Sequence, residues 1–556
     1  MNIQVSEVIV RFLEGLGVET IFGMPGAHIL PVYDELYDSG IKTVLVKHEQ
    51  GAAFMAGGYA RVTGKIGACI TTAGPGATNL ITGIANAYAD KQPVIAITGE
   101  APTHIFGKGG LQESSGEGGS VDQTALFSGV TRYHKLIERT DYLVNVLNQA
   151  ARQLLAVIPG PVVISIPFNV QKEMVDDSIL DRLACFERPA ETPVSPQLIN
   201  QSLAMIKEAQ KPVFVAGFGC IKAQAQAALT NLSDRLNIPV TSSLKGKGAL
   251  DERSELSLGS LGVTSSGCAL QYIINRADLI ILLGAGFNER TSYVWNDSLF
   301  KNKKIIQVDQ NPQQIEKVFK ADLAIHSDLG VYLQSLDEAC QAENLQKKQV
   351  EDIQLFRKKL EFDAVSQGKV IFNHKFDLVK YFYSMLEKSF SDGIILFDDN
   401  IIFSQNFYRV TSKDLFFPNT GVSSLGHAIP AAIGAGFKVD KPLFAIIGDG
   451  GFQMCAMEIM TAVNYDISLN IVLFNNQTLG LIRKNQHQQY EQRFLDCDFK
   501  NPDYAYLAKS FGIKHVKIES EQQCLSAFEQ MDFKQGINLI EIMIDKDAYP
   551  NYSSRR

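Results

Sequence analysis

Polar residues that could hold a metal ion follow two apolar segments near the C-terminal end of the chain. The segment 444–447 runs into Gly-Asp-Gly-Gly at 448–451, a helical stretch follows, and a second apolar segment ends at Asn475-Asn476. In a right-handed β–α–β unit both turns lie at the carboxyl ends of neighbouring parallel strands, so Asp449 and Asn476 are expected to meet. A carboxylate, an amide oxygen and a backbone carbonyl suit Mg²⁺, which keeps its other positions for water and a substrate phosphate.

The glycines of this turn add a second feature. Gly448, Gly450 and Gly451 let the backbone approach a ligand closely, and the start of the following helix offers unpaired N–H groups to an anion. Alone, such a turn is equally well explained as a tight strand-to-helix loop. Together with the Asn pair it favours a site for a metal ion and a phosphate group.

The order of Gly-Asp-Gly, one helix, one strand and Asn-Asn resembles the magnesium–diphosphate motif of thiamine-diphosphate enzymes. The resemblance implies that Asp449, Asn476 and the backbone carbonyl of Thr478 hold Mg²⁺. It also implies that Gly450 and Gly451 face the diphosphate of the coenzyme.

The same resemblance requires a carboxylic acid beside the aminopyrimidine ring of the coenzyme, and Glu49 is the candidate. A buried apolar strand expected at Thr43 to Val46 leads to Glu49, and a helix of small residues follows. An isolated glutamate at a helix start would be explained by the favourable N-terminal charge alone. In apolar surroundings, however, Glu49 would lose hydration, which favours the protonated acid that can hydrogen-bond the ring and promote removal of the thiazolium C2 proton.

Further segments over nearly the whole chain resemble the acetolactate synthase branch of this family; they are 21–34 (IFGMPGAHILPVYD), 48–64, 71–99, 110–113 (GLQE) and 160–167. The resemblance implies a decarboxylating carboligase that passes the product of a 2-oxo acid, such as pyruvate, to a second carbonyl compound. Leu425 matches the bulky residue that bends the coenzyme, and the carbonyl of Ser423 would accept a hydrogen bond from its amino group. Gln112, His28 and Leu425 are candidates on the substrate side.

Several positions depart from the pattern of this branch. Phe168 stands where the synthases have a lysine, and no tryptophan follows Arg483. Asp398-Asp399-Asn400-Ile401 replaces a Gly-Gln-His-Gln stretch. The central part has only short Gly-x-Gly turns, at 217–219 and 284–286, which do not complete a dinucleotide motif, so FAD is doubtful.

The pattern of short Val/Ile/Leu runs between amphipathic stretches predicts α/β structure with parallel sheets covered on both faces. In the 556-residue chain we expect three such domains: a pyrimidine-binding domain at 1–180, a central Rossmann-like domain at 190–340 and a diphosphate-binding domain at 365–556. Strands are expected at 43–46, 68–71, 94–98, 162–166, 213–216, 279–283, 305–308, 394–397, 444–447, 470–474 and 539–542. A Pro-rich linker is expected at Cys185 to Gln197, and a solvated connecting helix in the charged stretch from Asp337 to Lys369.

The family resemblance implies that active sites form between the first domain of one subunit and the third domain of another, as a homodimer or homotetramer. The net charge of −8 and the absence of a basic cluster argue against a nucleic-acid partner. No apolar run approaches the length of a membrane span, and the N-terminus lacks the features of a signal peptide. The eight cysteines are widely spaced, which is typical of buried thiols in a reducing cytoplasm.

Three other functions stay open at this point. The same coenzyme could serve a 2-oxo acid decarboxylase that releases an aldehyde, or a hydrolase that cleaves a diketone. The central domain could instead carry a flavin- or nucleotide-dependent oxidoreductase, or the scaffold could bind ligands without catalysis. The Gly/Ser-rich segment Ser114 to Ser120 is expected to be solvent-exposed slack rather than a lid.

Overall fold

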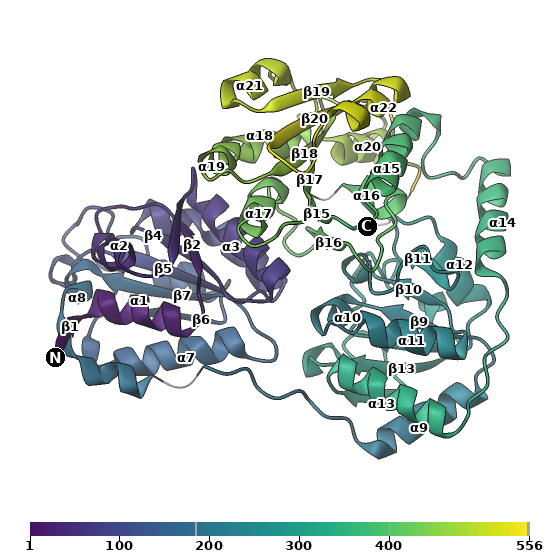
Figure 1. Cartoon of the computed structure of the whole chain (residues 1–556), viewed down its shortest axis with the longest axis horizontal. Coiled ribbons are helices and arrows are strands. Elements are labelled where there is room, and N and C mark those ends of the chain that lie inside the picture. The colour runs from purple at the N-terminus through teal and green to yellow at the C-terminus, as the bar shows by residue number, and fades with distance from the viewer. Residues whose placement is uncertain (184–185, 400, 553–556) are drawn as a thin grey trace.

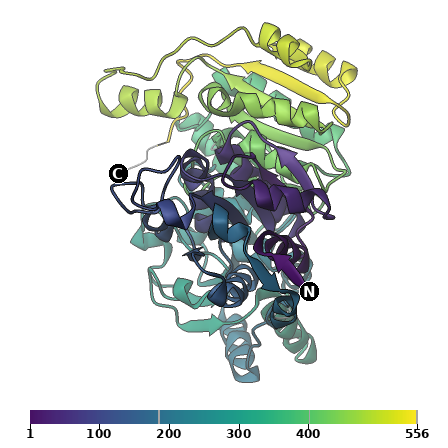
Figure 2. The same cartoon turned by 90° about the vertical axis from the view of Figure 1, so that its left-hand side faces the viewer.

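The computed structural model describes residues 1–183, 186–399 and 401–552. Three six-stranded parallel sheets, each flanked by helices, form three lobes (Figure 1). The third lobe, green to yellow, lies above the first, purple to blue, in both views (Figures 1 and 2). The predicted α/β class with three parallel sheets is confirmed.

The first sheet has the strand order β3-β2-β4-β5-β7-β6. Its strands are β2 (Thr20–Gly23), β3 (Lys42–Leu45), β4 (Gly67–Thr71), β5 (Val94–Glu100), β6 (Tyr133–Leu136) and β7 (Val162–Pro167). We expected β3 to be a buried strand, and this was wrong: only Val44 of its four residues is buried. The reason is its place at the edge of the sheet, where one side has no neighbouring strand.

The central sheet has the order β11-β10-β9-β12-β13-β14, and the third sheet the order β16-β15-β17-β18-β20-β19. The central strands are β9 (Pro212–Ala216), β10 (Val240–Ser242), β11 (Ser257–Ser260), β12 (Leu279–Leu283), β13 (Lys304–Asp309) and β14 (Leu323–His326). Those of the third sheet are β15 (Ile395–Asp398), β16 (Leu415–Pro418), β17 (Leu443–Gly448), β18 (Leu469–Asn475), β19 (Lys514–Ile518) and β20 (Ile537–Met543). Every strand expected from the sequence is present.

We expected one connecting helix in the charged stretch between the second and third lobes, but the structure has two separate helices there. Helix α13 (Leu329–Ala342) ends before Asn344, whose φ of 47° is left-handed and cannot continue a helix. Helix α14 (Ile353–Ser366) begins after Asp352, which caps it by accepting a hydrogen bond from the N–H of Leu355 (2.9 Å). Residues 186–195 of the expected linker contain neither helix nor strand; Cys185 lies outside the described residues.

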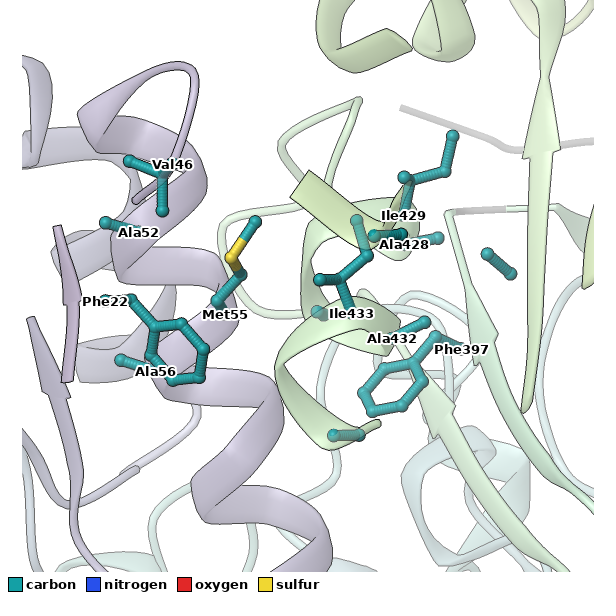
Figure 3. Close-up of a cluster of buried hydrophobic side chains, with 14 of the residues drawn as sticks. Phe22, Val46, Ala52, Met55, Ala56, Phe397, Ala428, Ile429, Ala432 and Ile433 are labelled. Atoms are coloured by element: carbon teal, nitrogen blue, oxygen red, sulfur yellow. The ribbon is translucent and has the colours of Figure 1, made fainter. Parts of the chain in front are cut away.

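Helix α3 (Glu49–Thr63) of the first lobe packs on helix α17 (Ala428–Ala435) of the third. Figure 3 shows Met55 on α3 facing Ile433 on α17. A side chain at Gly58 would overlap the backbone carbonyl of Ala431, so the two helices touch backbone to backbone there. Because every residue of α17 is buried, this contact fixes the first and third lobes against each other.

The described cysteines are all free thiols, and six of them are buried: Cys69, Cys220, Cys268, Cys340, Cys497 and Cys524. Within the described part of the chain, no helix combines the length and apolar character needed to cross a membrane.

Candidate active site

The Gly-Asp-Gly-Gly turn and the Asn pair meet where neighbouring strands end. Strands β17 and β18 are parallel partners, and helix α18 (Asp449–Cys455) starts directly after β17. The buried Asp449 accepts hydrogen bonds at Oδ2 from the backbone N–H groups of Asn476 (3.1 Å) and Gln477 (2.6 Å). Asn501, which the sequence gave no reason to include, donates to the same oxygen through its side chain (2.9 Å). Burial raises the pKa of Asp449, although these hydrogen bonds act in the opposite direction.

The side-chain amide of Asn476 and the backbone carbonyl of Thr478 converge beside this carboxylate. One terminal atom of the Asn476 amide lies 2.8 Å from the carbonyl oxygen of Thr478 and 3.3 Å from Oδ1 of Asp449. With the amide nitrogen at this position, Asn476 donates hydrogen bonds to both oxygens. If the amide is turned over, its oxygen takes this position, and three oxygens then face one point. An octahedral Mg²⁺ with ligands at about 2.1 Å sets neighbouring oxygens about 3 Å apart. The spacing of Asp449, Asn476 and Thr478 therefore fits the three protein ligands of such an ion.

No group of three or more His, Cys, Asp and Glu side chains that could hold a metal is found in residues 1–183, 186–399 and 401–552. Asp449, Asn476 and Thr478 offer a different kind of set, in which one carboxylate stands beside an amide and a backbone carbonyl.

A cavity of about 290 Å³ opens on this set of atoms. Asp449, Gly450, Gly451, Asn476 and Thr478 line it together with Leu425. At Gly451 a side chain would begin 2.6 Å from Oδ2 of Asp399, which leaves room only for glycine. Gly450 and Gly451 line the cavity without side chains, so a ligand there can approach their backbone closely.

Two consecutive buried aspartates lie at the same edge of the sheet: Asp398 ends β15, and Asp399 follows it. Asp399 lines the cavity and accepts hydrogen bonds from the backbone N–H groups of Gly426 (2.7 Å) and His427 (3.0 Å). Burial raises the pKa of Asp398 to about 7 and that of Asp399 to about 6. The sequence showed this pair only as a departure from the synthase motif; Asn400, which follows it, lies outside the described residues.

The loop held by Asp399 carries Leu425 and Ser423. Leu425 lines both the 290 Å³ cavity and a second cavity of about 250 Å³, whose walls include His48, Phe54 and Glu458. Ser423 has a φ of 61°, in the left-handed region. Leu425 thus separates the cavity beside Asp449 from a space that reaches the first lobe.

Glu49 lies at the carboxyl edge of the first sheet, at the start of α3. Its side chain is 8% exposed, and its Oε2 accepts a hydrogen bond from the side-chain amide of Asn79 (2.9 Å). Within a single chain Glu49 lines neither of the two cavities that Leu425 borders. The structure therefore brings Asp449, Asn476, Thr478 and Leu425 together, but Glu49 faces elsewhere.

His28 and Gln112 meet at the same edge of the first sheet. Nδ1 of the buried His28 lies 3.3 Å from Oε1 of Gln112, and Thr72 contacts both residues. Gln112 has a left-handed φ of 56°. We expected the segment after it to be solvent-exposed slack, but its first residue is ordered by the fold. Ser114 is buried and donates to Oε2 of Glu100 (2.6 Å). Only the tip of that segment, 116–119, is exposed, because the backbone pairs across its base.

The short glycine turns of the central lobe have a structural explanation. A side chain at Gly217 would overlap the carbonyl of Gly284, and one at Gly219 would begin 2.7 Å from the Cα atom of Gly284. The two turns pack against each other, which accounts for these glycines without a nucleotide. They border a cavity of about 330 Å³ between the first and central lobes.

Comparison with known proteins assigns all three lobes to one family. Residues 3–125 match the thiamine pyrophosphate enzyme N-terminal TPP binding domain, 199–336 the central domain, and 400–542 the C-terminal TPP binding domain. The chain belongs to the thiamine pyrophosphate enzyme family. Glu49, His28 and Gln112 fall in the first matched region, and Asp449, Asn476, Thr478 and Leu425 in the third. The two sheet edges described above thus both belong to domains of the family that bind the coenzyme.

Similar members of this family extend over nearly the whole chain. The probable acetolactate synthase large subunit of Methanocaldococcus jannaschii is 34% identical, over 97% of this chain and 92% of that protein. The acetolactate synthase isozyme 2 large subunit of Escherichia coli is 32% identical, over 97% of this chain and 95% of that protein. The acetolactate synthase large subunit of Lactococcus lactis is 30% identical, over 98% of this chain and 93% of that protein.

Proposed function

We propose that this protein is a decarboxylating carboligase of the acetolactate synthase kind, dependent on thiamine diphosphate and Mg²⁺. The substrate is a 2-oxo acid, and pyruvate is the first to test: two pyruvate molecules would give one acetolactate and one CO₂. The observation that carries the proposal is the convergence of the Asp449 carboxylate, the Asn476 amide and the Thr478 carbonyl on a glycine-lined cavity. The full-length similarity to acetolactate synthase large subunits supports the reaction type.

Each residue of the site has a separate task in this proposal. Asp449, the Asn476 amide and the Thr478 carbonyl hold the metal ion, and Gly450 and Gly451 admit the diphosphate. When bound, thiamine diphosphate supplies the nucleophilic carbon and the electron sink that decarboxylation of a 2-oxo acid needs. Leu425 sets the bend of the coenzyme, and the carbonyl of Ser423 accepts a hydrogen bond from its amino group.

Glu49 hydrogen-bonds the aminopyrimidine ring in this proposal, and it does so in the site of a second subunit. Within one chain Glu49 does not line the cavity of Asp449, so a site containing both residues needs another copy of the chain. We therefore propose at least a homodimer, in which the first lobe of one subunit closes the third lobe of the other. His28 and Gln112 share the sheet edge with Glu49 and would face the substrate.

The test is turnover of pyruvate by the full-length protein with added thiamine diphosphate and Mg²⁺. We expect acetolactate and CO₂, dependence on both additions, and loss of activity in Glu49→Gln. Acetaldehyde as the sole product would favour the simple decarboxylase, for which the loss of the synthase lysine at Phe168 gives a reason. Absence of coenzyme uptake in calorimetry would refute the proposal.

A further inference from the structure

The turn that carries Glu49 is held by side chains of the third lobe. This turn joins β3 to α3, and its backbone N–H groups point at the segment 458–465. Leu45 N–H donates to the hydroxyl of Tyr465 (2.7 Å). The N–H groups of Lys47 and His48 donate to Oε1 of Glu458 (3.1 and 2.8 Å), a residue 410 positions away from His48.

Glu458 is fitted closely to the start of helix α3. Its side chain is 3% exposed, and its Oε2 accepts a third hydrogen bond, from the hydroxyl of Thr461 (2.8 Å). A side chain at Gly51, in the first turn of α3, would overlap the carboxylate. Burial raises the pKa of Glu458, whereas the two backbone donors and the positive end of α3 favour its charged form.

These contacts fix the backbone immediately before Glu49. His48 caps α3, and Glu49 is the first residue of the helix. The flanking residues Val46 and Ala52 belong to the buried cluster between the lobes (Figure 3). With the N–H groups of Lys47 and His48 held by one carboxylate, the direction of the Glu49 side chain is set from the third lobe.

We propose that Glu458 is a positioning residue for Glu49. This inference rests on the proposed function, in which Glu49 contacts the coenzyme and Glu458 does not. Glu458 is absent from the lining of the cavity beside Asp449, and it acts on the acid through backbone hydrogen bonds only. Because Glu458 and Asp449 lie on the same stretch between β17 and β18, each third lobe would anchor one coenzyme and orient the acid for another.

The first experiment measures exchange of the thiazolium C2 proton for deuterium in thiamine diphosphate bound to the full-length protein with Mg²⁺. Exchange reports on activation by Glu49 and needs no substrate. We expect Glu49→Gln to slow exchange strongly, and Glu458→Gln to slow it by about 10- to 100-fold per bound coenzyme, because a small misplacement of a catalytic group has effects of this size. Glu529→Gln, an exposed site in the same lobe, is the matched control and should exchange at the wild-type rate.

A second pair of variants tests the same contact without removing an acid. Gly51→Ala places a methyl group against the Glu458 carboxylate, and we expect it to slow exchange as Glu458→Gln does. Gly57→Ala adds the same methyl group to the same helix where nothing lies within 4 Å, and should leave exchange unchanged. In the Glu49→Gln background, Glu458→Gln should cause no further loss.

The outcomes separate the two proposals. If Glu49→Gln exchanges at the wild-type rate, the proposed function is wrong. If Glu49→Gln is slow while Gly51→Ala and Glu458→Gln exchange normally per bound coenzyme, the positioning role is wrong, whatever their stability. If Glu458→Gln does not fold, exchange in Gly51→Ala alone decides.

Discussion

Replacing Asp449 by asparagine separates its structural task from the proposed metal site. In the absence of ligands its Oδ2 accepts three hydrogen bonds, from Asn476, Gln477 and Asn501, and its Oδ1 accepts one from the N–H of Gly450 (3.0 Å). An asparagine can keep its oxygen towards the three donors and turn its NH₂ group towards Gly450. The hydrogen bonds to Oδ1, from Gly450 and from the Asn476 amide in its donating orientation, are then lost at a cost of about 1 kcal/mol each, so the protein should fold.

Asp449→Asn should weaken coenzyme binding much more than it lowers the stability of the unliganded protein. Asp449 supplies the only negative charge among the three proposed ligands, and its loss should weaken Mg²⁺-dependent coenzyme binding by at least about 100-fold. At a coenzyme concentration 100 times the wild-type Kd, binding stabilises the wild type by about 2.7 kcal/mol. The same concentration would stabilise Asp449→Asn by only about 0.4 kcal/mol.

The assay is thermal unfolding of the full-length protein with no ligand, with Mg²⁺, and with Mg²⁺ and thiamine diphosphate. The wild type and Asp503→Asn should both show the coenzyme-dependent rise in midpoint. Asp503 is an exposed helix cap in the same lobe, where asparagine serves equally well. If Asp449→Asn keeps the full rise, the metal assignment is refuted.

Three further predictions concern other parts of the molecule. Leu425→Ala joins the two cavities, so turnover at saturating coenzyme should fall by at least about tenfold, whereas Leu425→Met should keep most of the turnover. The unfolding midpoint should change little, because Leu425 is only partly buried. Burial raises the pKa of Asp398 to about 7, so the folded protein loses stability relative to the unfolded chain as pH rises from about 4 to 7. Asp398→Asn lacks this loss and should unfold at a higher temperature than the wild type at pH 8 but not near pH 4; an equal difference at both pH values would contradict this reasoning. Gly58→Ala should lower the midpoint, since overpacking costs about 1–3 kcal/mol, whereas the neighbouring Gly57→Ala should not; equal midpoints would show that the helices can separate.

The parts of the site that follow from strand topology could be predicted from the sequence. Asp449 and Asn476 each follow an apolar strand, and parallel neighbours end at the same edge of a sheet, so their meeting needs no knowledge of packing. The contribution of Asn501 could not be predicted in this way. It comes from a loop that no strand places, and only the folded third lobe brings it to Asp449.

Contacts between lobes left no signal in the sequence. The hydrogen bonds from Lys47 and His48 to Glu458 join segments in different lobes, and neither segment has a pattern that points to the other. The expected burial of β3 was wrong for a related reason: a short apolar run does not reveal whether it lies in the middle of a sheet or at its edge. Tertiary packing decides both.

The backbone contact between α3 and α17 has a consequence for any attempt to divide the protein. The face of α3 that meets α17 includes Met55 and Gly58, and it would be exposed to water if the first lobe were produced as a fragment. Such a fragment should aggregate or recruit a substitute helix, however well its own sheet folds. Truncation is therefore a poor way to study either lobe, and single substitutions in the intact chain are the better tool.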